Sequence, residues 1–108
     1  MSIKKQSLEW APFILKKGAT EEHLLKASAV LQENFLQSQK GFVRRELLKK
    51  SDREYIDLVY WKTREDARNA IANAEKSPAC FTYFQLMEAA DHAQPGVGVL
   101  HFEILSEY

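Results

Sequence analysis

The apolar residues of this chain recur with two different spacings, and the changes of spacing divide it into strands and helices. Residues 7–16 are rich in apolar and aromatic side chains and precede Gly18, which predicts a strand, and Pro12 indicates that this strand faces an edge or a bulge. Thr20 then offers an N-cap oxygen, and apolar residues follow it at helical spacing. These residues are Leu24, Ala27, Leu31 and Phe35, and they predict a helix to about Gln39.

The segment from Gly41 to Ala70 is the most informative part of the chain. Gly41 ends the helix and begins a strand that extends to Lys49, and residues 50–53 form a polar reversal. Residues 55–61 show the side-chain alternation of a second strand. Two strands so close in sequence pair as an antiparallel hairpin.

Two helices and a strand complete the predicted order. Thr63 followed by Asp66 resembles a capping box, and the helix behind it carries a stripe of mostly small residues suited to close packing on a sheet: Ala67, Ala70, Ile71 and Ala74. Ser77 followed by Pro78 predicts the start of another helix, with Cys80, Phe84 and Met87 on one face. Residues 91–98 are predicted to form a loop, and residues 99–105 alternate again as a last strand.

The order strand, helix, strand, strand, two helices, strand predicts an α+β fold of the ferredoxin-like, split βαβ kind. Helices cover one face of a four-stranded antiparallel sheet in such a fold. Alternation places apolar side chains on the other face as well, and a lone chain would expose them. Members of this set are Leu8, Trp10, Ile56, Leu58, Tyr60, Leu100, Phe102 and Ile104. We therefore expect a homodimer with two facing sheets; the sequence does not settle which set of alternating residues faces the partner.

Composition narrows the functional classes. The 108 residues, 45% of them hydrophobic, suit one domain over residues 1–108, and the 15 basic and 15 acidic side chains cancel, which argues against binding to nucleic acid or an anionic membrane. Neither a signal peptide nor a membrane span is recognisable, so we expect a soluble, cytoplasmic protein. The single cysteine, Cys80, excludes an internal disulfide and lacks zinc-site spacing.

The chain resembles the antibiotic biosynthesis monooxygenase-like proteins of the dimeric α+β barrel superfamily along nearly its whole length. The residues that carry the resemblance are the runs 11–18 (APFILKKG), 41–43 (GFV) and 57–61 (DLVYW), with Ala67 and Ala70 behind them. The resemblance implies the fold more specifically than the reaction, because the superfamily includes cofactor-free quinol and polyketide oxygenases, haem-degrading enzymes and members without an assigned activity.

Haem degradation is not favoured. That branch uses an Asn on the first strand, a Trp on the helix after the hairpin and a His about ten residues beyond it. Ungapped counting places these three positions near Ala11, Ala70 and Phe84, and none of them matches. The four glycines, at positions 18, 41, 96 and 98, form no phosphate-binding loop, so neither nicotinamide nor flavin is expected by a Rossmann route. We expect no cofactor and no metal.

The resemblance to the oxygenases implies an apolar cavity that holds a phenol or quinol, together with a base that deprotonates it. With the usual strand order, Glu9, Asp57 and either His101 or Glu103 share one face near the sheet centre and are candidates for this base. Arg44 is a candidate for holding a developing oxyanion. Candidate aromatic and apolar walls are Trp10, Phe13, Phe35, Trp61, Tyr83, Phe84 and Met87.

Structural interpretations of the same residues stay open. Glu9, Asp57 and Arg44 can form an internal ion-pair network, His101 can be a satisfied sheet residue, and Trp61 can be a packing anchor at a strand end. The alternative function is a non-catalytic dimeric protein that binds a small hydrophobic ligand. A pocket lined only by apolar atoms would favour it.

Overall fold

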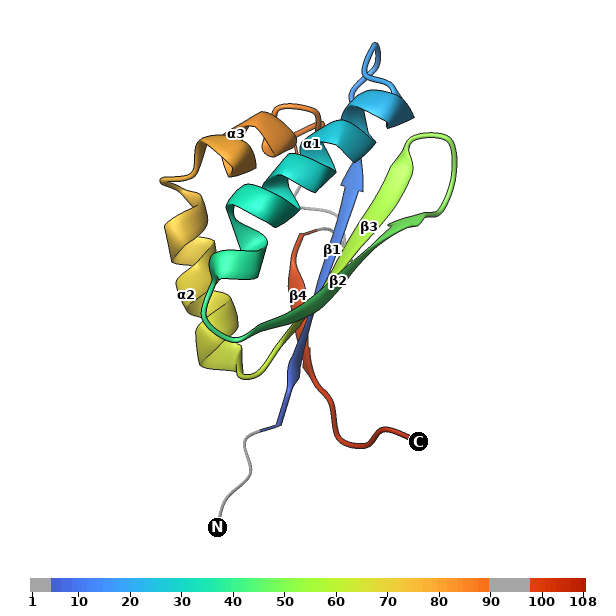
Figure 1. The fold of residues 1–108 in the computed structure, drawn as a ribbon. Coiled ribbons are helices and arrows are strands. Elements are labelled where there is room, and N and C mark those ends of the chain that lie inside the picture. The colour runs from blue at the N-terminus through green and yellow to red at the C-terminus, as the bar shows by residue number, and fades with distance from the viewer. Residues whose placement is uncertain (1–4, 90–97) are drawn as a thin grey trace.

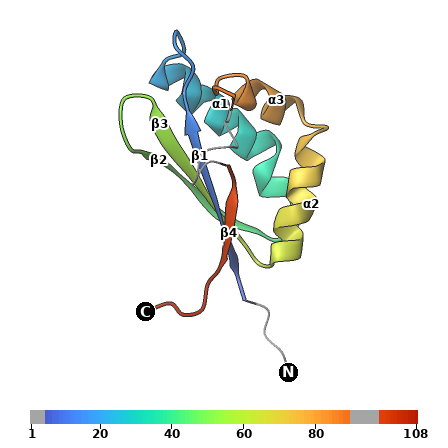
Figure 2. The same ribbon diagram turned by 180° about the vertical axis from the view of Figure 1, so that it is seen from behind.

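Four antiparallel strands form one sheet, and the helices lie together on one side of it in both views (Figures 1 and 2). The computed structural model describes residues 5–89 and 98–108. The strands, in the spatial order β2-β3-β1-β4, are β1 (Ser7–Ile14), β2 (Phe42–Lys49), β3 (Glu54–Trp61) and β4 (Leu100–Glu103). The helices are α1 (Glu21–Asn34), the short 3-10 helix η1 (Leu36–Ser38), α2 (Arg64–Ala74) and α3 (Pro78–Phe84). The predicted α+β, ferredoxin-like fold is confirmed.

All three predicted N-caps are present. The hydroxyls of Thr20, Thr63 and Ser77 accept hydrogen bonds from backbone amides three residues ahead, at 3.1, 3.0 and 3.2 Å. Each bond satisfies a helical N–H that has no partner within its own helix. The helix starts are therefore fixed by local sequence.

Several element ends differ from the sequence prediction, those of the first helix and the last strand among them. The first helix ends at Asn34 rather than near residue 39, because Phe35 leaves the helical conformation and buries its ring. The last strand is limited to Leu100–Glu103, because Glu103 already pairs with Ser7 at the beginning of β1. Pro12 lies in the half of β1 that β4 does not pair. The loop predicted at residues 91–98 lies outside the described residues except for Gly98.

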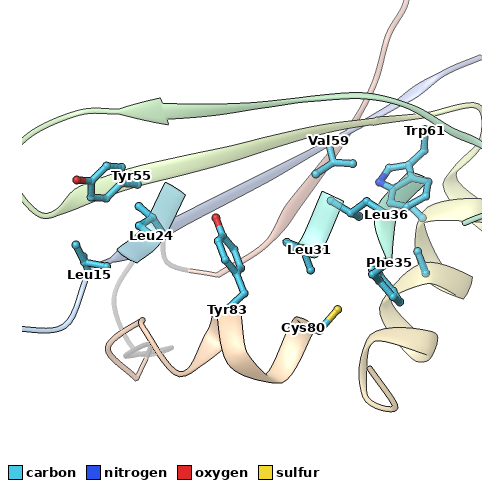
Figure 3. Packing of buried hydrophobic residues seen from close by; sticks show 12 residues of the cluster. Leu15, Leu24, Leu31, Phe35, Leu36, Tyr55, Val59, Trp61, Cys80 and Tyr83 are labelled. Atoms are coloured by element: carbon cyan, nitrogen blue, oxygen red, sulfur yellow. The ribbon is translucent and has the colours of Figure 1, made fainter. Parts of the chain in front are cut away.

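Burial along β3 shows which side of the sheet faces the helices. Tyr55, Asp57, Val59 and Trp61 are buried, whereas the residues between them are half-buried. The buried set packs against side chains from the helices, as Figure 3 shows for the core residues Leu15, Leu24, Leu31, Phe35, Leu36, Tyr55, Val59, Trp61, Cys80 and Tyr83.

The opposite face of the sheet carries no helix in the described residues, and it is apolar along β1, β3 and β4, with Arg44 and Glu46 on the outer strand β2. The register places Leu8 opposite Tyr60 and Phe102, and Trp10 opposite Leu58 and Leu100. These residues, which we call the helix-free face, are half-buried or exposed. The sequence alone did not show which set of alternating residues faces away from the helices. The structure shows that it is this set. Within the described residues no helix has the length and apolar character needed to cross a membrane; the cytoplasmic location stays a prediction.

We expect Gly41→Ala to destabilise the protein more than Gly18→Ala. Both glycines have positive φ, at +81° and +90°, which costs an alanine about 1–2 kcal/mol. A Cβ on Gly41 would also lie 2.6 Å from Cβ of Asp66 at the start of α2, whereas no atom lies within 4 Å of a Cβ on Gly18. The clash should add about 1–3 kcal/mol to the loss in free energy of unfolding. Urea unfolding of both variants measures the difference, and equal losses would contradict this account.

Candidate active site

A cavity of about 550 Å³ lies between the helix-covered face of the sheet and the helices. Strands β1, β2 and β3 supply one wall, and α2, α3 and the residues around η1 supply the others. This volume falls within the range of roughly 300–1,000 Å³ that is usual for small-molecule sites. Most of the predicted site residues line it: Glu9, Phe13, Phe35, Asp57, Trp61, Tyr83, Phe84 and Met87.

Glu9 presents a carboxyl to this cavity from the middle of β1. It forms no ion pair or hydrogen bond of ordinary geometry among the described residues. Burial raises its pKa from 4.5 to about 7; the Trp61 indole and the Arg45 charge oppose the shift, and the Asp57 charge adds to it. Because the folded protein holds this proton more tightly than the unfolded chain, the free energy of unfolding falls as pH rises from 4.5 to about 7.

Trp61 places an unused hydrogen-bond donor beside this carboxyl. Its side chain is 1% exposed, and its Nε1 atom is buried without a hydrogen-bond partner in the described part of the chain. Figure 3 shows the indole nitrogen turned inward, on the side of Leu36. A buried N–H without a partner costs free energy, so this donor is suited to a ligand oxygen or to ionised Glu9. Trp61 thus contributes both an aromatic wall and a buried N–H donor to the cavity lining.

Asp57 is fully engaged in a buried network. Its Oδ1 accepts a hydrogen bond from Nε of Arg45 at 2.9 Å and lies 2.9 Å from Nη2 of the same guanidinium, and its Oδ2 accepts a hydrogen bond from the Tyr83 hydroxyl at 2.7 Å. Arg45 Nη1 donates to the carbonyl of Ser28 in α1 at 3.2 Å. Burial and the Asp57 charge raise the pKa of Tyr83 far above its usual range, so this phenol stays protonated. Both carboxylate oxygens of Asp57 therefore have partners within the protein, whereas those of Glu9 do not among the residues that the structure describes.

Two predicted site residues lie outside the cavity. Arg44 is on the helix-free face, with its guanidinium 3.9 Å from the centre of the Tyr60 ring and paired with Glu46 at 3.0 Å. A β-bulge between Phe42 and Arg44 shifts the alternation, so that Arg45 points to the helices instead. Trp10 also lies on the helix-free face, since alternation along β1 separates it from Glu9 and Ala11.

His101 is beside Glu9 in the sheet but does not line the cavity. The register of β1 with β4 places the two residues directly opposite one another, on the same face, as expected. Its Nδ1 is buried and has no partner among the described residues. Burial, followed by the charges of Arg64 and Arg68 on α2, lowers the pKa of this imidazole, which favours its neutral form.

Ala11, Ala70 and Phe84, the positions that the sequence comparison assigned to the Asn, Trp and His of haem-degrading enzymes, all line the cavity. None of the three offers a nitrogen or oxygen from its side chain. Among residues 5–89 and 98–108, no three His, Cys, Asp or Glu side chains form a group that could hold a metal ion.

Arg45 is the residue that reasoning from the sequence missed. Regular alternation from Phe42, which packs on Trp61, places Arg44 toward the helices. The extra residue in the bulge reverses this, and no local signal in the sequence marks the position of the bulge. The sequence indicates only that two adjacent arginines lie in one strand, which is unusual.

Comparison with known proteins supports the fold and leaves the activity open. No protein-family model matches the sequence, and no curated protein matches it significantly. Solved structures do match. One is SnoaB, a cofactor-independent oxygenase from Streptomyces nogalater, with 20% identity, a TM-score of 0.69, and coverage of 96% of this chain and 95% of SnoaB.

Two further structures are of proteins provisionally assigned as antibiotic biosynthesis monooxygenases. The one from Bordetella bronchiseptica has 11% identity, a TM-score of 0.72, and coverage of 97% of this chain and 100% of its own. The one from Nitrosomonas europaea has 16% identity, a TM-score of 0.62, and coverage of 100% and 97%. The resemblance to antibiotic biosynthesis monooxygenase-like domains is thus confirmed in the fold, over nearly the whole chain.

We expect Arg45→Met to destabilise the protein strongly and Arg44→Met to have little effect. Removing Arg45 leaves the Asp57 carboxylate buried without its partner, a change that costs about 3–5 kcal/mol. Arg44 makes exposed contacts with Glu46 and Tyr60, worth about 1 kcal/mol or less. Chemical denaturation of the two variants measures this contrast between neighbouring arginines. A similar loss for both would mean that Arg45 is not buried in the network.

Proposed function

We propose that this protein is a cofactor-independent monooxygenase that acts on a small aromatic phenol or quinol held between the sheet and its helices. The observation that carries the proposal is Glu9, whose carboxyl faces a largely apolar cavity and has a pKa of about 7. A general base works best when its pKa lies near the working pH, because it is then both available and basic enough. Perturbed carboxyls in clefts are typical of functional sites.

Glu9 accepts the proton of the phenol hydroxyl, and the resulting phenolate carries high electron density on its ring carbons. One of these carbons forms a bond to dioxygen, giving a ring hydroperoxide. The O–O bond then breaks with loss of the ring proton, so that one oxygen atom stays as a carbonyl and the other leaves as water. A phenol with a free para position thus becomes a para-quinone: phenol plus dioxygen gives quinone plus water. The four electrons come from the substrate.

The neighbouring groups support these steps in different ways. Trp61 Nε1 donates a hydrogen bond to the phenolate oxygen, which lowers the energy of the charged intermediate in a site that largely excludes water. Asp57, Arg45 and Tyr83 hold one another and form a rigid polar part of the wall. His101, opposite Glu9 in the sheet, is kept in its neutral form and so adds no positive charge that would weaken Glu9 as a base.

The shared fold with SnoaB, which is a cofactor-independent oxygenase, supports this class of reaction. The alternative is a non-catalytic protein that binds a small hydrophobic ligand in the same cavity. The complete pairing of Asp57 with Arg45 and Tyr83 is what such a protein would show. The polar atoms of Glu9 and Trp61, which are not paired in this way, favour the monooxygenase.

The helix-free face is the proposed contact between two copies of the chain. A sheet with helices on one side and apolar side chains on the other leaves a large apolar area in water, and a second sheet packed about 10 Å away would bury it. The same patch on both copies gives a two-fold symmetric interface, which is the commonest arrangement. The cavity lies on the other side of the sheet, so dimerisation leaves it open to a ligand.

We expect Glu9→Gln to lower oxygen consumption with a reduced quinone or phenol by about 10²–10⁴-fold, since this is the usual contribution of a general base. The wild-type rate should rise with pH through about 7, as the Glu9 carboxylate forms. The amide in the Glu9→Gln variant does not titrate, so the residual rate of this variant should not rise with pH in the same way. Oxygen-electrode assays across pH measure both effects.

The matched control is Glu103→Gln, which changes a glutamate on the same sheet face that is exposed and outside the cavity lining. It should keep wild-type activity. A second readout does not depend on turnover: Glu9→Gln should remove the loss of stability between pH 4.5 and about 7. Absence of turnover by a folded wild-type dimer, over a broad panel of quinols and polyphenols, would refute the monooxygenase.

We expect Leu58→Glu to dissociate the dimer. It places a charge at the centre of the helix-free face, where the second copy would have to desolvate it. Sedimentation analysis at micromolar concentration should give the mass of two chains for the wild type and of one for the variant. Leu25→Glu, on the exposed side of α1, is the control and should stay dimeric. A wild-type monomer under these conditions would contradict the interface.

A further inference from the structure

The mouth of the cavity is bordered by large apolar side chains that are exposed to water. Phe81 and Phe84, three residues apart on α3, are 65% and 53% exposed, and Ile71 on α2 and Val99 just before β4 are 45% and 50% exposed. All four also line the cavity. We call these four residues the rim. Single exposed apolar residues are ordinary, but four around one opening form a patch that usually marks a binding surface.

The polar atoms of the cavity lie on another side. Glu9, Arg45 and Asp57 project from the strands, and the Trp61 nitrogen lies at the end of β3. A ligand that reaches from these groups to the rim therefore meets hydrogen-bonding atoms at one end and mainly carbon at the other, where the exposed Glu75 at the end of α2 is the charged lining residue.

The size of the cavity points in the same direction. An apolar cavity of about 150 Å³ is enough to hold benzene. The volume here is about 550 Å³, so a phenol with a single ring would leave most of it unfilled. Unfilled apolar space forfeits contacts, and a larger apolar ligand would bind more tightly.

We propose that the rim is an apolar subsite, and that the substrate is a phenol bearing an apolar chain that extends over Phe81 and Phe84. This inference rests on the proposed function for the phenol end of the ligand. It makes the rim, rather than the groups near Glu9, the part of the site that selects among phenols.

Calorimetric titration without oxygen tests this with a series from meta-cresol to meta-nonylphenol, in which the para position stays free. Affinity should rise by about two- to fourfold for each methylene, the upper value corresponding to full burial. The double variant Phe81→Ser, Phe84→Ser should lose most of this rise, while its affinity for meta-cresol should change much less. Leu25→Ser, an equally exposed leucine of α1 outside the cavity lining, is the control and should keep it. Circular dichroism and thermal melting check that the variants are folded.

A flat response to chain length, or a full rise in the double variant, would overturn the proposal. A third result would also overturn it: the wild type binds phosphatidylcholine vesicles, the double variant does not, and affinity for phenols does not depend on chain length. The rim would then be a lipid contact. The two proposals fail separately. A rise in affinity without any oxygen consumption contradicts only the monooxygenase, whereas turnover with a flat response contradicts only the subsite.

Discussion

The buried ion pair between Arg45 and Asp57 joins the two layers of this fold. Its members come from β2 and β3, and its hydrogen bonds reach the Ser28 carbonyl of α1 and the Tyr83 hydroxyl of α3. Apolar packing alone would permit the helices to shift on the sheet, whereas these directional bonds are satisfied in one arrangement. The position of α3, and with it one wall of the cavity, therefore depends on this pair.

The same pair decides which carboxyl is available for chemistry. Asp57 is neutralised by Arg45 and bonded to Tyr83, so its charge is stabilised and its lone pairs are occupied. Glu9, two strands away from Arg45 and facing the same space, lacks such a partner within the described residues and holds its proton up to a pH of about 7. A carboxyl held in this way lowers stability at neutral pH. Local features that reduce stability in this way are concentrated at functional sites, which is why Glu9 is the more informative of the two acids.

Much of the fold is predictable from the sequence because its signals are local. Thr20, Thr63 and Ser77 each mark a helix start through a bond that spans three residues, and the alternation in β3 needs no knowledge of its neighbours. The side of the sheet on which Glu9, Asp57 and His101 meet also follows from alternation and strand order. Arg44 and Trp10 were assigned to the cavity wrongly, for two reasons. A bulge reverses the alternation before Arg44, and the choice of face for Trp10 depends on which side the helices cover.

The remaining features of the site arise from contacts between distant parts of the chain. The unused donor of Trp61 becomes visible only when its burial and the absence of a nearby acceptor are known together. Ala11, Ala70 and Phe84 line the cavity, and their side chains supply no nitrogen or oxygen atom to it. A scaffold that is fixed by caps, alternation and one ion pair can keep its shape at 11–20% identity while the few residues facing the cavity change. The chemistry of this chain must therefore be argued from Glu9 and Trp61, and not from the fold that holds them.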